Sequence, residues 1–291
     1  MLEYKSVAEL VSAAEKAGAT ISELVLRDQA EQLELPAEAL LERMSERLDV
    51  MEASVKSGLD PGIRSTSGLT GGDAAKQWTH AADGICGGFF AKAIARALAV
   101  SEYNAAMGRI VAAPTAGSCG ILPGTVISLL DEGRCSRHAA VMSLFTAGAF
   151  GIVIAEKATI AGAEGGCQAE CGAASAMAAA AATELMGGTP KMCAEACAMA
   201  IKNQLGLVCD PVAGLVEVPC IKRNAAGTSI AFTAADMALA GISSRIPVDE
   251  CIDAMREIGE SMPCALRETA KGGLAATQTG QRLREQIFGR K

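Results

Sequence analysis

The chain has 291 residues and a formal net charge of −7, with 50% of its residues hydrophobic and 3% aromatic. This length suits one large or two ordinary domains, and the acidic balance without a basic run argues against nucleic-acid binding. Because aromatic residues are few, the core has to be built from Ala, Leu, Ile, Val and Met, and 31 glycines favour closely packed helices.

The first 57 residues predict three amphipathic helices with a charged outer face. Gly18 ends the first apolar pattern, and Thr20 with Glu23 has the spacing of a capping box that opens the second helix. Pro36 suits the first position of the third helix. We expect residues 1–57 to form an N-terminal helical layer, either as part of the same domain or as a docking surface, although a solvated face is the simpler interpretation.

Residues 58–291 predict a helical domain in which Ala-rich helices alternate with loops rich in Gly, Ser, Thr and Pro. Alternating apolar and polar residues are scarce, so we expect an all-α fold whose interhelical loops converge on one site. The uncharged run 139–155 is marginal as a membrane span and predicts a buried core helix instead. The predicted helices are 90–107, 125–132, 136–157, 173–186, 191–204, 225–240 and 248–258.

The chain contains eleven cysteines, and this odd number excludes a complete disulfide framework. The opening residues show no basic stretch followed by an apolar run, which is the pattern of a secretory signal. Cysteine-rich chains without an export signal are typical of the reducing interior of the cell. We therefore expect a cytoplasmic protein that does not enter a membrane.

Three of these cysteines lie in the most glycine- and proline-rich stretches of the second half. Cys167 follows two glycines, while Cys209 and Cys220 bracket the stretch Cys-Asp-Pro-Val-Ala-Gly-Leu-Val-Glu-Val-Pro-Cys. A core cysteine usually replaces an apolar residue inside a helix or strand, whereas thiolates on irregular loops can converge on a metal. Three thiolates without a histidine suit iron, and a fourth position left open for substrate is typical of a catalytic iron–sulfur cluster.

Two further loops are rich in hydroxyl groups and glycine. One is Ser-Thr-Ser-Gly-Leu-Thr-Gly-Gly-Asp at 65–73, and the other is Ala-Pro-Thr-Ala-Gly-Ser-Cys-Gly at 113–120. Glycine permits close backbone approach, and N–H groups at a helix start can hold a carboxylate. Each loop also fits a capped turn, and neither has the Gly-Lys-Ser/Thr ending of a phosphate loop.

Taken together, these segments resemble the iron–sulfur-dependent L-serine dehydratases, specifically the α chain of their two-subunit form. The resemblance rests on residues 65–73, 113–120, 162–168 and 209–224, and it extends over nearly the whole chain. It implies conversion of L-serine to pyruvate and ammonia by an oxygen-sensitive [4Fe–4S] cluster in a helical domain. The cluster cysteines of the family map onto Cys167, Cys209 and Cys220.

The chemistry of β-elimination fits these residues, because it needs a Lewis acid at the departing hydroxyl and a base for the α-proton. A pyridoxal enzyme would instead need a phosphate cradle, which nothing around Lys76 or Lys222 supplies. We expect the planar fork of Arg223 to suit the substrate carboxylate. The candidate substrate-binding residues are Ser67, Thr70, Asp73, Thr115, Ser118 and Arg223.

The sequence leaves the general base open. His80 follows the first hydroxyl-rich loop and is the candidate catalytic residue, while His138 opens an apolar helix and suits a surface position. A carboxylate such as Glu170 and a residue of a partner chain are the alternatives. Family members that combine the α and β parts in one polypeptide carry an additional domain before the helical one. We therefore expect that a separate β chain supplies this domain here.

Several alternatives share parts of this pattern. A related cluster-dependent lyase such as a cysteine desulfidase would use the same three thiolates, and a non-catalytic cluster-binding subunit would close the cluster with a fourth, for which Cys119 is the candidate. A structural zinc site normally shows closely spaced ligand pairs, unlike Cys167 and Cys209. Cys171, Cys193 and Cys197 lie on Ala-rich helices and predict core positions.

Overall fold

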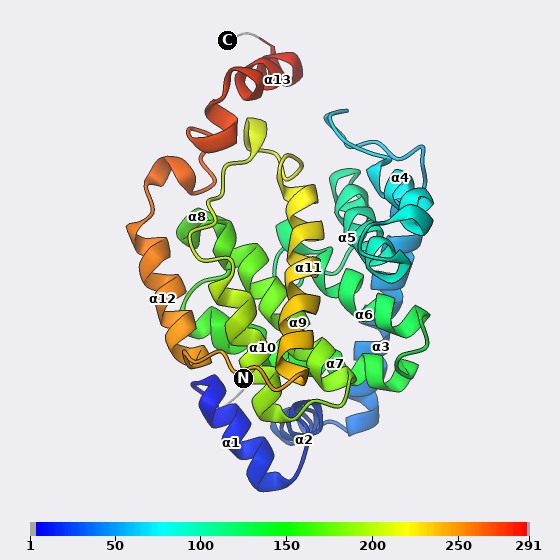
Figure 1. Cartoon of the computed structure of the whole chain (residues 1–291), viewed down its shortest axis with the longest axis vertical. Helices are drawn as coiled ribbons and strands as arrows, with labels where there is room; N and C mark the ends of the chain where they lie inside the picture. The colour runs from blue at the N-terminus through cyan, green and yellow to red at the C-terminus, as the bar shows by residue number, and fades with distance from the viewer. Residues whose placement is uncertain (1–3, 290–291) are drawn as a thin grey trace.

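The computed structural model describes residues 4–289, and this part of the chain is built from α-helices without a β-strand (Figure 1). A single isolated β-bridge joins Cys209 to Arg267. The predicted all-α fold is confirmed. The helices are α1 Val7–Ala17, α2 Ile21–Leu33, α3 Ala37–Gly58, α4 Asp73–Thr79, α5 Gly88–Ala105, α6 Ile121–Asp131, α7 Arg137–Lys157, α8 Gly162–Gly165, α9 Ala173–Leu185, α10 Pro190–Lys202, α11 Cys220–Leu239, α12 Val248–Ser261 and α13 Gln278–Phe288.

Helix α9 is the centre of the fold, surrounded by α6, α7, α10 and α11 (Figure 1). Every residue from Ala173 to Thr183 is buried, and most of them are alanines. A helix that is apolar all round is buried on all sides, and alanine side chains let neighbouring helices approach closely. Gly227 of α11 shows how tight this packing is, because a Cβ at this position would lie 2.8 Å from the hydroxyl of Ser175.

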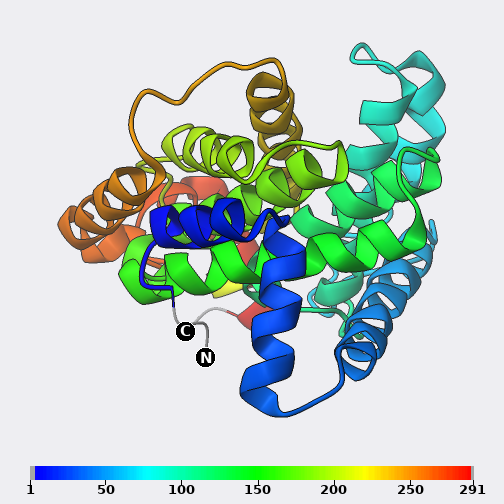
Figure 2. The same ribbon diagram turned by 90° about the horizontal axis from the view of Figure 1, so that it is seen from below.

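The N-terminal helices α1 and α2 lie at the lower end of the bundle, while α3 runs up its side and packs against α5 (Figures 1 and 2). Their apolar faces belong to the same hydrophobic core as α7 and α9. Two carboxylates of the body cap their N-termini, since Asp249 accepts from Val7 N at 3.0 Å and Glu184 accepts from Ser22 N at 3.3 Å. Of the predicted layer 1–57, residues 1–3 lie outside the described residues.

The predicted ends of the N-terminal helices agree with the structure, with one exception. Gly18 closes α1 in the left-handed conformation at φ 61°, and Thr20 with Glu23 forms the full capping box of α2. Pro36 has an extended backbone and stands before α3 instead of occupying its first turn. The helix therefore starts one residue later than the proline rule predicts.

Helix α7 contains the long uncharged run. It is the one helix in the described part of the chain that is long and apolar enough to cross a membrane, and 67% of its most apolar window is buried inside the protein. Helices α2, α3 and α9 pack against it. This packing is that of a core helix, as predicted for residues 139–155.

The structure differs from the predicted elements in several places, and two of them bear on the site. Helix α11 begins at Cys220, directly after Pro219, so this cysteine opens a helix instead of lying in a loop. A π-helical turn, Gln168–Gly172, follows Cys167 and leads into α9. The short helix α4 and the C-terminal helix α13 were not predicted, because both depend on contacts that their own sequences do not show.

The close packing around α9 predicts a strong penalty for added volume. Ala179→Leu should lower the free energy of unfolding by roughly 1–3 kcal/mol, because a fully buried alanine has no space for three more carbons. Urea denaturation followed by circular dichroism measures this change. Ala226→Leu, at an exposed position of α11, is the matched control and should change stability by less than about 0.5 kcal/mol. Equal stability of the two variants would contradict the central role of α9.

Candidate active site

The three predicted cluster cysteines are buried, with 2%, 3% and 7% exposure for Cys167, Cys209 and Cys220. They come from three separate segments: the start of the π-helical turn, the loop after α10, and the first residue of α11. The loop that leads into α11, drawn in yellow, reaches the upper end of the bundle beside α8 (Figure 1). The predicted convergence of these loops is therefore seen in the structure.

The thiols lie close enough to change one another's ionisation. Burial raises the pKa of Cys220 to about 12, and the charge on Cys167 adds to this shift. Burial likewise raises the pKa of Cys209, with further contributions from Glu170 and Cys167. The pKa of Cys167 is lowered, first by a hydrogen bond from the Cys171 thiol, whose sulfur lies 3.4 Å away, and then by the charge of Arg223. Cys167 is thus the thiol most easily ionised.

This donor set fits an iron–sulfur cluster better than a single metal ion. Among residues 4–289, no group of three His, Cys, Asp or Glu side chains is arranged to hold one metal ion. In a cubane cluster each cysteine binds a different iron, so the three sulfurs do not need to meet at one point. Three buried thiols without histidine are the soft donors that such clusters use. A tetrahedral zinc site has no support in this geometry.

Glu170 is the carboxylate nearest to these thiols. The hydroxyl of Thr115 donates to its Oε1 at 2.9 Å, while Oε2 accepts no hydrogen bond from residues 4–289. A Cβ on Gly162 would lie 2.8 Å from Glu170 Oε2 and 3.1 Å from Cys209 Sγ. Glycine at position 162 therefore lets this carboxylate and this thiol approach the same short helix.

The environment of Glu170 also shifts its protonation. Burial raises the pKa of the carboxyl above its ordinary value, and the negative charge of Glu268 raises it further, against the hydrogen bond from Thr115. A carboxyl whose pKa is shifted in this direction, and which shares the surroundings of Gly162 with Cys209, has the character of a general acid or base. The structure thus favours one of the alternatives that the sequence left open.

The loop 113–120 is held in place by Asn224, a residue that the sequence analysis did not single out. Asn224 donates to the carbonyl of Gly117 and accepts from the N–H of Gly120, both at 2.8 Å. Thr115 and Ser118 lie side by side, with their hydroxyl oxygens 3.1 Å apart. The spacing Cys220 to Asn224, one helical turn, was the available signal, because it puts both residues on the same face of α11.

Arg223 lies beside Cys167, and both of its terminal nitrogens have partners in the chain. One donates to the carbonyl of Val208 at 2.7 Å, and the other donates to Asp210 at 2.8 Å. Asp210 in turn accepts from the N–H of Leu274 at 2.7 Å. These two bonds fix the position of the guanidinium and use two of its five N–H donors.

The loop 65–73 docks onto the segment that carries Cys209 and Cys220. Ser67 accepts from the N–H of Leu69 at 3.1 Å, which is the contact of a capped turn. Thr70 donates to Glu217 at 2.7 Å, and Asp73 pairs with Lys222 of α11 at 2.7 Å. Hydrogen bonds from Lys222 and Lys76 hold the pKa of Asp73 below its ordinary value.

The candidate base His80 lies apart from this cluster. It is exposed and follows the last residue of α4, whereas Asp73 at the other end of α4 contacts α11. Seven residues of helix separate the two, which is about 10 Å along the axis. His80 lines an open surface pocket with Arg64 and Lys76. Its position in the sequence, close to the loop 65–73, does not translate into proximity to the thiols.

The remaining cysteines have other surroundings. Cys119 is fully buried and faces Ser101 of α5, and burial raises its pKa to about 12. Cys193 and Cys197 are buried on α10. The structure thus keeps these three cysteines inside the helical core.

Comparison with known proteins shows which family this chain resembles. Residues 16–275 match the model of the serine dehydratase alpha chain family. A protein of Bacillus subtilis named probable L-serine dehydratase, alpha chain, is 53% identical over 288 residues, which is 98% of this chain and 96% of the relative. The L-serine dehydratase, alpha chain, of Peptoniphilus asaccharolyticus is 45% identical over 96% of this chain and 97% of its own length.

A longer relative shows the same segment inside a larger polypeptide. The L-serine dehydratase of Mycobacterium bovis is 40% identical over 94% of this chain, which corresponds to 61% of that protein. The family match covers all three buried cysteines, the loop 113–120 and Glu170. The chain belongs to the serine dehydratase alpha chain family.

Proposed function

We propose that this chain is the catalytic α subunit of an L-serine dehydratase, which converts L-serine to pyruvate and ammonia with a [4Fe–4S] cluster bound by Cys167, Cys209 and Cys220. The observation that carries the proposal is the meeting of three buried thiols with the unpaired oxygen of Glu170. Membership in the family supplies the substrate, since the relatives are named for L-serine.

The reaction removes the α-proton and the β-hydroxyl of L-serine, and the resulting 2-aminoacrylate tautomerises and hydrolyses to pyruvate and ammonia. The cluster supplies Lewis acidity for the departing hydroxyl. We assign removal of the α-proton to Glu170 Oε2, because Oε1 is held by Thr115 while Oε2 has no internal donor among the described residues.

The hydroxyl groups of Thr115 and Ser118 are placed to orient the substrate. They lie 3.1 Å apart on a loop that Asn224 fixes from both sides. A substrate bound at these hydroxyls would lie beside the proposed base, because Thr115 donates to Glu170. Arg223 forms an ion pair with Asp210, and its positive charge offsets the negative charge of the ionised Cys167 thiol.

We further propose a cytoplasmic enzyme that works with a separate β chain. All eleven cysteines are free in the described part of the chain, which suits a reducing compartment. Relatives of nearly the same length are named alpha chains, and this name implies a second chain.

Single replacement of a ligand cysteine tests the cluster assignment. Cys167→Ala, Cys209→Ala and Cys220→Ala should each lose the brown colour of anaerobically purified protein and its bound iron and sulfide, because each removes one iron ligand. Cys193→Ala is the control, and it should retain the cluster while losing about 1 kcal/mol of stability. Loss of the cluster from Cys119→Ala, with retention in Cys167→Ala, would contradict the assignment.

Replacement of Glu170 tests the proposed base. Glu170→Gln should lower kcat by about 10²-fold or more with an unchanged cluster spectrum, because the amide keeps the shape but cannot accept the α-proton. The exposed Glu164→Gln is the matched control, and it should remain within about twofold of the wild type. Full activity of Glu170→Gln together with an inactive His80→Ala would identify His80 as the base instead.

The two-chain proposal predicts that the isolated chain holds its cluster but turns over L-serine poorly. Addition of the separately encoded β chain should restore turnover and give a stable complex in size-exclusion chromatography. L-Cysteine as a second substrate separates serine dehydration from desulfhydration. Full turnover of L-serine by this chain alone would show that no β chain is required.

A further inference from the structure

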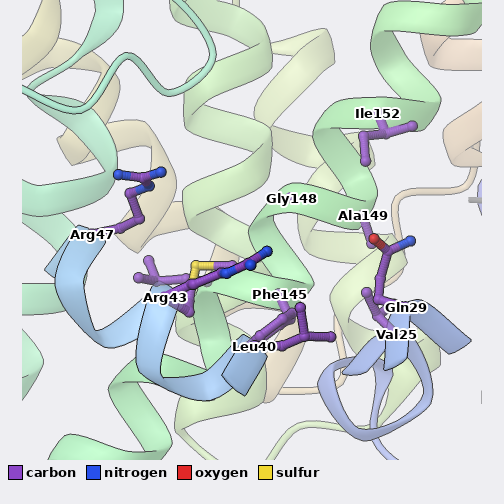
Figure 3. A pocket seen from close by; sticks show the side chains of 11 residues that line it. Val25, Gln29, Leu40, Arg43, Arg47, Phe145, Gly148, Ala149 and Ile152 are labelled. Carbon is purple, nitrogen blue, oxygen red and sulfur yellow. The ribbon is translucent and has the colours of Figure 1, made fainter. Parts of the chain in front are cut away.

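An apolar groove lies between α2, α3 and α7, at the end of the molecule opposite the cysteine loops (Figures 1 and 3). Its volume is about 230 Å³. Leu40 and Phe145 line its floor, and Ile152 is 37% exposed at its edge. None of these residues has a role in the proposed reaction, so the groove needs a separate explanation.

Gly148 of α7 is the most informative residue of the groove. A Cβ at this position would have no other heavy atom within 4 Å. Glycine inside a helix is destabilising by roughly 0.5–1 kcal/mol relative to alanine. We therefore expect a close contact that leaves no room for a side chain at such a position. Gly151, one turn further on, has such a reason, because its Cβ would lie 2.8 Å from Met177. At Gly148 no neighbouring helix of the described chain makes such a contact, so the close contact is left to a molecule outside the chain.

The rim of the groove carries an unpaired positive charge. Arg43 and Arg47 lie one turn apart on α3, and Arg43 extends across the groove towards Gly148 (Figure 3). Neither arginine has an ion pair or hydrogen bond within residues 4–289, whereas Arg137 pairs with Asp49 and Glu52 of the same helix. Like charges at this spacing destabilise a helix, so the pair is better satisfied by an anionic partner.

We propose that this groove binds an apolar helix flanked by carboxylates, presented by the β chain. The inference rests on the two-chain part of the proposed function. Phe145, Gly148 and Ile152 follow the i, i+3, i+7 spacing along α7, so they lie along one face of this helix, on which a partner helix can pack. The two arginines then meet acidic residues at the edge of the partner helix.

Two other occupants fit the groove less well. A second copy of this chain would bring Arg43 and Arg47 against the same pair if the two-fold axis passed through the rim, and these like charges would then repel. A small ligand usually occupies a pocket of roughly 300–1,000 Å³ that encloses most of its surface. This groove, at about 230 Å³, is smaller and open to solvent.

The experiment measures binding of the β chain to the full-length, cluster-loaded chain under anaerobic conditions. Gly148→Leu fills the groove without an internal clash, and it should raise the Kd of the complex at least about tenfold. The double variant Arg43→Glu with Arg47→Glu should have a similar effect and should weaken the dependence of binding on salt. Arg27→Glu, an exposed charge reversal on α2, is the control, with a Kd within about twofold of the wild type.

The outcomes separate this proposal from the proposed function. A Kd that Gly148→Leu leaves unchanged, no complex with the wild-type chain, or loss of self-association instead of β-chain binding would each overturn the docking site. The cluster spectrum and L-serine turnover are followed in parallel. If the complex depends on the groove but does not turn over L-serine, the docking site stands and the proposed function fails. If the β chain at limiting concentration restores L-serine turnover equally in all variants, the proposed function stands and the docking site fails.

Discussion

The fixed position of α9 is the constraint on which the site depends. Because all residues from Ala173 to Thr183 are buried among other helices, the first turn of α9 cannot shift without disturbing the core. The π-helical turn before it carries Glu170 and Cys171 and follows Cys167 directly. Tight packing of α11 on α9 through Gly227 fixes Cys220 and Asn224 relative to that turn. Small side chains in the core thus determine the geometry of distant loops.

Carboxylates of neighbouring helices join the outer helices to this core. Asp249 caps α1, Glu184 caps α2, and Glu102, which is 1% exposed, accepts from Asp73 N at 2.9 Å and Ala74 N at 3.1 Å at the start of α4. Backbone N–H groups at helix starts satisfy these negative charges. Glu170 differs from them, because a side-chain hydroxyl satisfies only one of its oxygens. Three carboxylates therefore serve structure, while the fourth keeps an oxygen available for chemistry.

The sequence predicted the long helices because their apolar periodicity is strong, and it predicted the site segments because their glycines and prolines are unusual. It missed α4, whose start depends on Glu102 from a different helix. It favoured His80 because this residue follows the loop 65–73 in the sequence, and in the structure His80 is exposed directly after α4. The fork of Arg223 was assigned to substrate because its contact with Asp210 forms only when the loop 209–219 folds back on α11.

The electrostatics of the site explain why one arginine lies inside it. Three thiols and a carboxylate share a buried region, so each negative charge makes the next one more costly. Burial is the main cause that raises the pKa of Cys209 and of Cys220, whereas the hydrogen bond with Cys171 and the charge of Arg223 lower the pKa of Cys167. Arg223, held by Asp210, offsets the first charge but not all of them. In the proposed cluster, bound iron would displace the remaining thiol protons, and its positive charge would stabilise the clustered thiolates together.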